Sequence, residues 1–358
     1  MRFVLVVGLL PFLLFASCKG AGTAAPGAAT AGATAPGATT SAAAAGDRQA
    51  IFLGSPEETL KPTIWDTGDT TVTNEDRLEI YEPHIRGIGG GYFGVGSIQN
   101  FTLAAWARSE YIWLMDFTRV VVAANKIHTA FLKRLKTPAE HRLMWDKKKS
   151  AAAADKIFDE EFKGSDELPF IKESYRKASG YLIITFGFLD KLTKKRPYKF
   201  WLNDQEQYDY LKGLALAGRI RALRGDLNGP TTVTGIATAA KQMGVPLRIL
   251  YYSNAEEYFK GYKEPFKKSF SQMPVDDKSF VVRTISFNKG KFRWAEDSDL
   301  STDRGFHYSL QPATEFVEAL KLAQVDVRDF YKTALIDPKE YGLSWLGSLA
   351  EKKRAAGK

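Results

Sequence analysis

Cysteine is almost absent from this 358-residue chain, whose one cysteine is Cys18. A single cysteine cannot form a disulfide within the chain, and it excludes thiolate metal sites and a cysteine nucleophile in the body of the protein. Histidine is also scarce. The four histidines are dispersed without the spacing of metal ligands: His84, His128, His141 and His307. No G-x-S-x-G motif is present, so a serine hydrolase of the α/β-hydrolase type has no support either.

Long hydrophobic runs are absent except at the start of the chain. Met1-Arg2 precede an apolar run over residues 3–15, and Ala16-Ser17-Cys18 follow it. One cation, a short apolar run and small residues are typical of an export signal. The run is shorter than the about 20 apolar residues that a transmembrane helix needs. A transmembrane helix is therefore not expected. Metal ligands and a nucleic-acid partner are not expected either.

The cysteine directly after Ala16-Ser17 predicts a bacterial lipoprotein. In that interpretation residues 1–17 are the signal peptide, and Cys18 becomes the mature N-terminus. Cys18 carries the lipid, which includes palmitate. Phe15 stands where leucine is commoner, and an ordinary signal peptide is the alternative. The prediction places the protein in the cell envelope, anchored by lipid on the periplasmic or cell-surface side. Lys19 favours the outer membrane in the common Gram-negative sorting scheme.

Charge is absent from residues 20–46, which are almost entirely Ala, Gly, Thr and Pro. Such a segment cannot bury enough apolar surface to order itself, so residues 18–46 are predicted to be a lipidated, disordered linker. Its root-mean-square reach is on the order of 30 Å. Residues 47–358 remain, which is enough for one large domain. The net charge of +9 fits an anionic neighbour but does not identify one.

The body of the chain alternates strands and helices. Residues 91–96 and 111–116 have the continuous apolar pattern of buried parallel strands, and residues 98–108 and 120–135 have helical spacing. This βαβα unit predicts a parallel sheet. Further strands are predicted at 220–227, 247–252, 280–287 and, as the last one, 307–310; helices are predicted at 231–243 and, as the last one, 312–323.

Residues 136–216 interrupt this rhythm with an alanine run and mixed basic and aromatic residues, and they predict a mainly helical insertion. The fold class is therefore α/β: a Rossmann-like three-layer αβα sandwich with a mostly parallel sheet and a helical insertion, over residues 47–358.

Two glycines after the first strand and an acid after the second form the main candidate site. Gly94 and Gly96 allow a ligand to approach the backbone, and Asp116, 20 positions after Gly96, stands where ribose-binding folds place a hydroxyl acceptor. The alternative is structural: the glycines serve a tight turn, and Asp116 caps the following helix.

Ligands of open α/β sheets bind beyond the carboxyl ends of the strands, where further polar residues should converge. These are Gln99, Asn100, Asp226, Ser253 and Asn254. Asn254 is also a good N-cap, and Asp226 suits a turn in Asp-Leu-Asn-Gly.

Four stretches resemble signatures of an uncharacterised bacterial family that includes lipoproteins. They are residues 91–102 (GYFGVGSIQNFT), 224–227 (RGDL), 252–258 (YSNAEEY) and 307–311 (HYSLQ). The resemblance covers roughly residues 78–322. It implies a core similar to class I S-adenosylmethionine-dependent methyltransferases, with a seven-stranded mixed sheet and helices on both faces. His307 lies in one of the matched stretches, so the resemblance favours it over the other histidines for a functional role.

The chain departs from the methyltransferase pattern. Active members have an acid where Tyr92 stands and a third glycine where Ile98 stands. The predicted compartment also has no evident supply of the cofactor, so no cofactor is expected. The sequence thus favours a ligand- or partner-binding protein. One alternative is an active methyltransferase using S-adenosylmethionine. The other is a surface protein that binds anionic polymer or membrane through basic patches at 147–149, 194–201 and 260–270.

Overall fold

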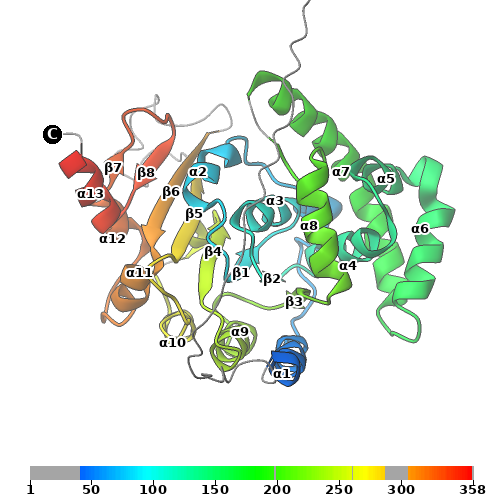
Figure 1. The fold of residues 1–358 in the computed structure, drawn as a ribbon, viewed down its shortest axis with the longest axis horizontal. Helices are drawn as coiled ribbons and strands as arrows, with labels where there is room; N and C mark the ends of the chain where they lie inside the picture. Colours follow the sequence, from blue (N-terminus) through cyan, green and yellow to red (C-terminus); the bar gives the residue numbers. More distant parts are fainter. Residues whose placement is uncertain (1–40, 197–198, 260, 287–304, 357–358) are drawn as a thin grey trace, which may run out of the picture. The chain divides into compact units, whose positions relative to one another are not determined.

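The computed structural model describes residues 41–196, 199–259, 261–286 and 305–356. Residues 42–358 form a compact unit of their own. Within the described residues, eight strands form one sheet in the order β3-β2-β1-β4-β5-β6-β8-β7 (Figure 1). The prediction of an α/β protein with a mostly parallel mixed sheet is confirmed, and the architecture is compatible with a Rossmann-like fold.

The first five strands are parallel neighbours, and the last three are mixed in direction. The antiparallel strand β6 pairs with β5, β8 lies parallel to β6, and β7 closes the edge antiparallel to β8. The strand bounds are β1 Gly91–Val95, β2 Tyr111–Asp116, β3 Ile220–Arg224, β4 Leu247–Ser253, β5 Phe280–Ser286, β6 Phe306–Pro312, β7 Leu335–Ile336 and β8 Leu343–Trp345.

Two predictions about the C-terminal part are wrong. Residues 307–310 are not the last strand, and 312–323 do not contain the last helix. After β6 and α11 (Ala313–Ala319) come α12 (Val327–Tyr331), β7, β8 and α13 (Ser348–Ala356). The sheet therefore has eight strands rather than the seven that the resemblance implies. β7 and β8 have only two and three residues, too few to show strand alternation in a sequence.

Side chains of successive strand residues point to opposite sides of the sheet, which gives it two different faces. One face carries Tyr92, Tyr251 and Tyr308 and is called here the tyrosine face. The other carries Phe93 and packs against Phe316, among other rings, and is called the phenylalanine face. Each face is the centre of one buried apolar core.

Helices cover both faces (Figure 1). The tyrosine face is covered by helices that bury the apolar side chains of its core: α2 (Glu82–Ile85), α3 (Ile98–Ala107), α4 (Arg119–Arg134) and α8 (Gln205–Leu216). Between α4 and α8 lie α5 (Pro138–Met144), α6 (Lys147–Glu161) and α7 (Leu168–Lys195), so the segment predicted as an insertion is helical. The phenylalanine face is covered by α1 (Ser41–Leu53), α9 (Thr232–Gln242), α10 (Glu264–Phe270) and α11.

The strand order changes direction beside β1. From β1 the chain moves outward to β2 and β3, and it then returns to β4 on the other side of β1. Open α/β sheets bind ligands at the carboxyl ends of the strands at such a point. The fold thus directs attention to the ends of β1, β2 and β4.

Candidate functional site

The turn after β1 is tied to the end of β2. Gly96 has φ of +90°, a conformation that favours glycine. Its N–H donates to Asp116 Oδ2 at 3.1 Å, and its carbonyl accepts a hydrogen bond from Asn125 Nδ2 at 2.9 Å. A Cβ atom at position 96 would lie 2.7 Å from Gln99 Nε2. The backbone conformation therefore favours glycine here, and a larger residue would also displace the Gln99 side chain.

Asp116 uses both carboxylate oxygens within the chain. While Oδ2 accepts from Gly96, Oδ1 accepts from the backbone N–H of Thr118 at 2.8 Å, just before α4. Burial raises the pKa of Asp116 to about 6, the hydrogen bonds from Thr118 and Gly96 lower it, and nearby Asp66 raises it. The acid predicted to contact a ribose thus joins the β1 turn to the start of α4.

Asn100 fills the space beside Gly94. Its Oδ1 accepts from Tyr92 Oη at 2.8 Å, and its Nδ2 donates to the carbonyls of Val95 at 2.9 Å and Ser97 at 3.1 Å. A Cβ atom at position 94 would lie 2.0 Å from Asn100 Oδ1. Gly94 is therefore needed for packing against Asn100, and this side of the turn is occupied by the chain itself.

Three polar atoms around the same turn are buried without a hydrogen-bond partner in the described part of the chain: Ser97 Oγ, Gln99 Oε1 and Asn125 Oδ1. Each unsatisfied buried group costs roughly 1–3 kcal/mol. Such groups are common at functional sites, because a ligand can supply the missing partner. The turn thus combines a closed packing arrangement with unused hydrogen-bonding capacity.

A carboxylate from the segment before β1 lies over the end of β4. Glu75, only 1% exposed, accepts hydrogen bonds from Tyr251 Oη and, at 3.0 Å, from Ser253 Oγ. Burial raises the pKa of Glu75, although the hydroxyls of Thr284, Tyr251, Ser253 and Thr73 lower it. Ser253 has a left-handed φ of +49°. Glu75 gave no signal in the sequence, because its partners in β4 are 176 and 178 positions away.

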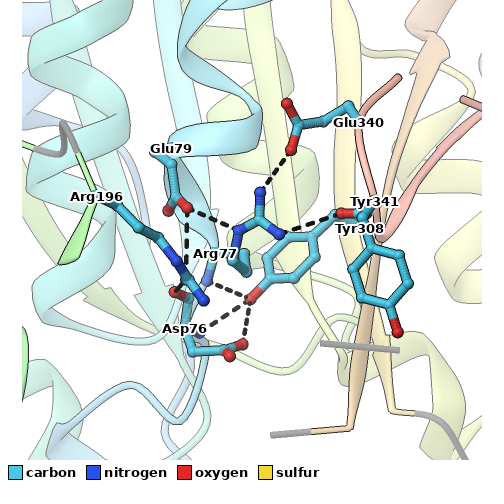
Figure 2. Close-up of polar contacts among 7 residues, drawn as sticks. All are labelled: Asp76, Arg77, Glu79, Arg196, Tyr308, Glu340 and Tyr341. Carbon is cyan, nitrogen blue, oxygen red and sulfur yellow. Dashed lines mark hydrogen bonds and ion pairs between the residues drawn. The ribbon is translucent and has the colours of Figure 1, made fainter. Parts of the chain in front are cut away.

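The segment that contains Glu75 is fixed to β6 by Tyr308 (Figure 2). Tyr308 Oη accepts hydrogen bonds from the backbone N–H groups of Asp76 and Arg77, both at 2.9 Å. A network of charged side chains surrounds this contact, with ion pairs Arg77–Glu79, Arg77–Glu340 and Arg196–Glu79. Tyr308 lies on β6, opposite Thr284 of β5. The segment therefore crosses over β5, from the end of β4 to β6.

The remaining predicted residues lie in different settings. Asp226 Oδ1 accepts from the N–H of Asn228 at 2.8 Å in a turn after β3. Asn254 precedes the 3₁₀ helix η3 (Ala255–Tyr258) and makes no side-chain capping hydrogen bond. His307 is buried on β6, three strands from β1, with Nε2 at 2.7 Å from Ser344 Oγ. The structure thus brings together Gly94, Gly96, Gln99, Asn100 and Asp116, links Ser253 to Glu75, and separates His307 from them.

A cavity of about 750 Å³ opens beyond the end of β4, on the side of the phenylalanine face. Its wall is formed by residues 256–259, 261–262 and 323–329. Glu256 in this wall pairs with Arg283, Oε2 to Nε at 2.6 Å, and accepts a hydrogen bond from Tyr262 Oη. Carboxylates beside aromatic rings suit a hydroxylated or cationic ligand. The residue stretch 252–258, singled out in the sequence, supplies Glu256 but gave no indication of a cavity.

Two histidines that appear unrelated in the sequence are in contact. His128 Nδ1 lies 2.9 Å from His141 Nε2, and both side chains are fully buried. Burial lowers the pKa of His128 to about 3, and burial together with His128 lowers the pKa of His141 well below its usual value. Both are therefore neutral. Nowhere in the described ranges do three or more His, Cys, Asp or Glu residues form a group that could hold a metal ion.

A family model described as a domain of unknown function (DUF7790) matches residues 70–347, which include the β1 turn, Glu75 and the cavity. No curated protein matches the chain. Cys18 and residues 19–40 of the predicted linker lie outside the described residues. Residues 41–46, predicted as the end of that disordered linker, form the start of α1 instead. None of the described helices is long and apolar enough to cross a membrane.

Proposed function

The chain belongs to the family of the domain of unknown function DUF7790, and we propose that it is a lipid-anchored cell-envelope protein that binds a ligand or partner. Its methyltransferase-like fold, in this proposal, serves recognition and transfers no methyl group. The first five strands follow the order 3-2-1-4-5 of dinucleotide-binding sheets, which supports the fold assignment.

The crowding around Asp116 is the observation that favours binding over methyl transfer. A cofactor ribose would use the acceptors of this carboxylate, and the N–H groups of Gly96 and Thr118 already occupy one acceptor position on each of its two oxygens. Asn100 fills the space beside Gly94, and Glu75 lies over the end of β4. The chain's own side chains thus occupy the crevice that a nucleoside would enter.

The ligand is proposed to bind in the cavity beside η3. A volume of about 750 Å³ lies within the range of small-molecule sites, and the wall combines carboxylates with aromatic rings. Tyr258, at the cavity edge, is 77% exposed and available for contact. In this scheme the lipid at Cys18 and the linker hold the domain near the membrane while the cavity remains open to the envelope.

An active methyltransferase is the second candidate. It is favoured by the contact between Gly96 and Asp116 and by the unpartnered atoms of Ser97, Gln99 and Asn125 at the same turn. A cofactor that displaced the Gln99 side chain could satisfy these atoms.

Binding of anionic polymer through the basic patches has less support. Lys147 donates to the carbonyl of Arg176, Lys149 pairs with Asp146, and Lys199 pairs with Asp204. Lys267 is buried and donates to the carbonyl of Ala323. Residues 197–198 and 260 of these patches lie outside the described residues.

Calorimetry separates the first two candidates. Residues 42–358 would be titrated with S-adenosylmethionine and with its demethylated product. We expect no binding of either at millimolar concentration, because Asn100 and Glu75 occupy the space that a nucleoside would enter. Binding that disappears in Asp116→Ala but persists in Asp226→Ala, a matched change in the neighbouring turn, would replace our proposal with the enzyme.

Anchoring is tested separately in cells. Lipidation at Cys18 predicts that the full chain incorporates a labelled fatty acid and fractionates with membranes. The variant Cys18→Ser should lose the label. A wild-type chain that incorporates no label would contradict the anchor.

A further inference from the structure

The outer side of α7 has an apolar stripe with lysines at both ends. Residues at spacings of three and four lie on one side of a helix. Along α7 such a series is Lys177, Tyr181, Ile184, Phe188, Lys191 and Lys195. Ile184 is 73% exposed, Tyr181 is 47% exposed, and Lys191 and Lys195 are exposed as well. The helix thus presents to solvent a surface that a water-soluble helix usually keeps polar.

A turn from the N-terminal part of the domain extends this surface. Ile64 and Trp65 are 85% and 55% exposed. The 3₁₀ helix η1 (Gly68–Thr71) follows them and packs on α7 so closely that a Cβ atom at Gly68 would lie 2.1 Å from the carbonyl oxygen of Lys177. The same Cβ would lie 2.9 Å from the Tyr181 ring. Exposed apolar groups from two separate segments therefore occur on neighbouring elements.

The carboxylates near the stripe, on α7 and in the turn, have partners. Glu173 pairs with Lys177, and Asp190 pairs with Arg142. In the Ile64–Trp65 turn, Asp66 accepts hydrogen bonds from backbone N–H groups, and Asp69 in η1 is exposed. Arg119, whose N–H binds Asp66 in the Ile64–Trp65 turn, is exposed. Apolar side chains with Trp and Tyr among them, bordered by Lys and Arg, match the chemistry of a bilayer surface with anionic headgroups.

We propose that the outer side of α7 and the Ile64–Trp65 turn lie on the surface of an anionic lipid bilayer. Ile184, Tyr181, Ile64 and Trp65 enter the headgroup region, and Lys191 and Lys195 at the C-terminal end of the stripe contact lipid phosphates. The helix lies along the membrane and does not cross it, consistent with the described helices, none of which could span a bilayer. The biological setting rests on the proposed lipid anchor, but the surface contact itself does not need the lipid.

Vesicle flotation of residues 42–358, which lack Cys18, tests the contact without the anchor. With vesicles of phosphatidylglycerol and phosphatidylcholine, we expect the wild-type protein to float, and to float less with phosphatidylcholine alone. Ile184→Ser should weaken partitioning about tenfold, the change expected when one large aliphatic side chain no longer leaves water. Leu216→Ser, at a 62% exposed position on α8, is the matched control and should have no effect. Lys191→Gln with Lys195→Gln should reduce binding to the anionic vesicles only.

Tryptophan fluorescence gives the location of the contact. Vesicles should shift the emission to shorter wavelength, brominated lipids should quench it, and Trp65→Phe should remove both changes. A wild-type protein that does not bind anionic vesicles would overturn the proposal. Equal losses of vesicle binding in Ile184→Ser and Leu216→Ser would also overturn it. Sedimentation that shows a dimer lost in Ile184→Ser would also overturn it and assign the surface to a second copy of the chain. These outcomes leave the fatty-acid labelling and calorimetry results unaffected, so the two proposals fail separately.

Discussion

The two faces of the sheet each bury a glutamate, but they stabilise it in different ways. On the tyrosine face, Glu75 accepts hydrogen bonds from hydroxyl groups, and burial raises its pKa. On the phenylalanine face, Glu256 is paired with Arg283, which is completely buried. Burial alone would lower the pKa of the Arg283 guanidinium, but Glu256 outweighs burial and the net shift is upward.

The difference extends to the layers that cover the two faces. Against the tyrosine face lies the neutral pair His128–His141, whose rings pack among Trp145 and Trp201. The phenylalanine face keeps its charges, and Arg283 lies over the rings of Phe316 and Phe330. A face that uses neutral titratable groups is sensitive to pH, whereas a face that uses an ion pair is sensitive to loss of either partner.

The largest effect is expected from Arg283→Met. This change leaves Glu256 buried without its cation, and breaking a buried pair typically costs about 3–5 kcal/mol. Urea unfolding of residues 42–358, followed by tryptophan fluorescence, measures the loss. The double variant Arg283→Met/Glu256→Leu should recover part of the stability. If the double variant is as unstable as the single one, shape rather than charge governs this site.

Acid should weaken the other face. Because the pKa of His128 is about 3 in the folded protein, the unfolded chain binds more protons below pH 6.5, and stability falls as pH falls toward 3. At pH 4 this loss is on the order of 3 kcal/mol relative to pH 7. The loss should be clearly smaller in His128→Phe than in the wild type. It should be only slightly smaller in His84→Phe, since His84 is half-buried and burial lowers its pKa less than that of His128. Identical pH profiles for His128→Phe and wild type would show that the pair does not titrate on unfolding.

The smallest effect is expected from Glu75→Gln. The raised pKa of Glu75 means that the folded state holds a proton more tightly than the unfolded state. Its stabilising contribution is therefore present below about pH 4.5 and is lost as pH rises through the folded pKa. Glutamine resembles the protonated acid, so at pH 7 the unfolding free energy should change by no more than about 1 kcal/mol. A loss as large as that of Arg283→Met would remove the contrast between the two glutamates.

Much of the parallel part of the sheet could be predicted from the sequence. β1, β2 and β4 are continuous apolar runs that end in polar residues or glycine, and α4 and α9 have clear helical spacing. The segment from residue 62 to residue 81 could not be predicted, because its short 3₁₀ helices are ordered by contacts with distant residues such as Tyr308. β7 and β8 could not be predicted for the same reason, because their few residues acquire an extended conformation only by pairing with other strands.

For the candidate site, the sequence located the turn but not its internal contacts. Gly96 and Asp116 lie together as their spacing suggests, since parallel strands end at one edge. The spacing does not reveal which partners the carboxylate has. The contacts of Glu75 with β4 and of Glu256 with Arg283 involve residues on separate elements, so no local pattern contains them.

The hydroxyl of Tyr308 also bears on the order in which the chain acquires its structure. It accepts hydrogen bonds from residues 232 and 231 positions earlier, which lie just before the first strand. Closing a loop of that length is entropically unfavourable until most of the sheet exists, so these contacts should form late in folding. A chain that emerges N-terminus first must therefore leave residues 75–77 unattached until β6 has been made. The end of β4 then receives its covering segment among the last events of folding.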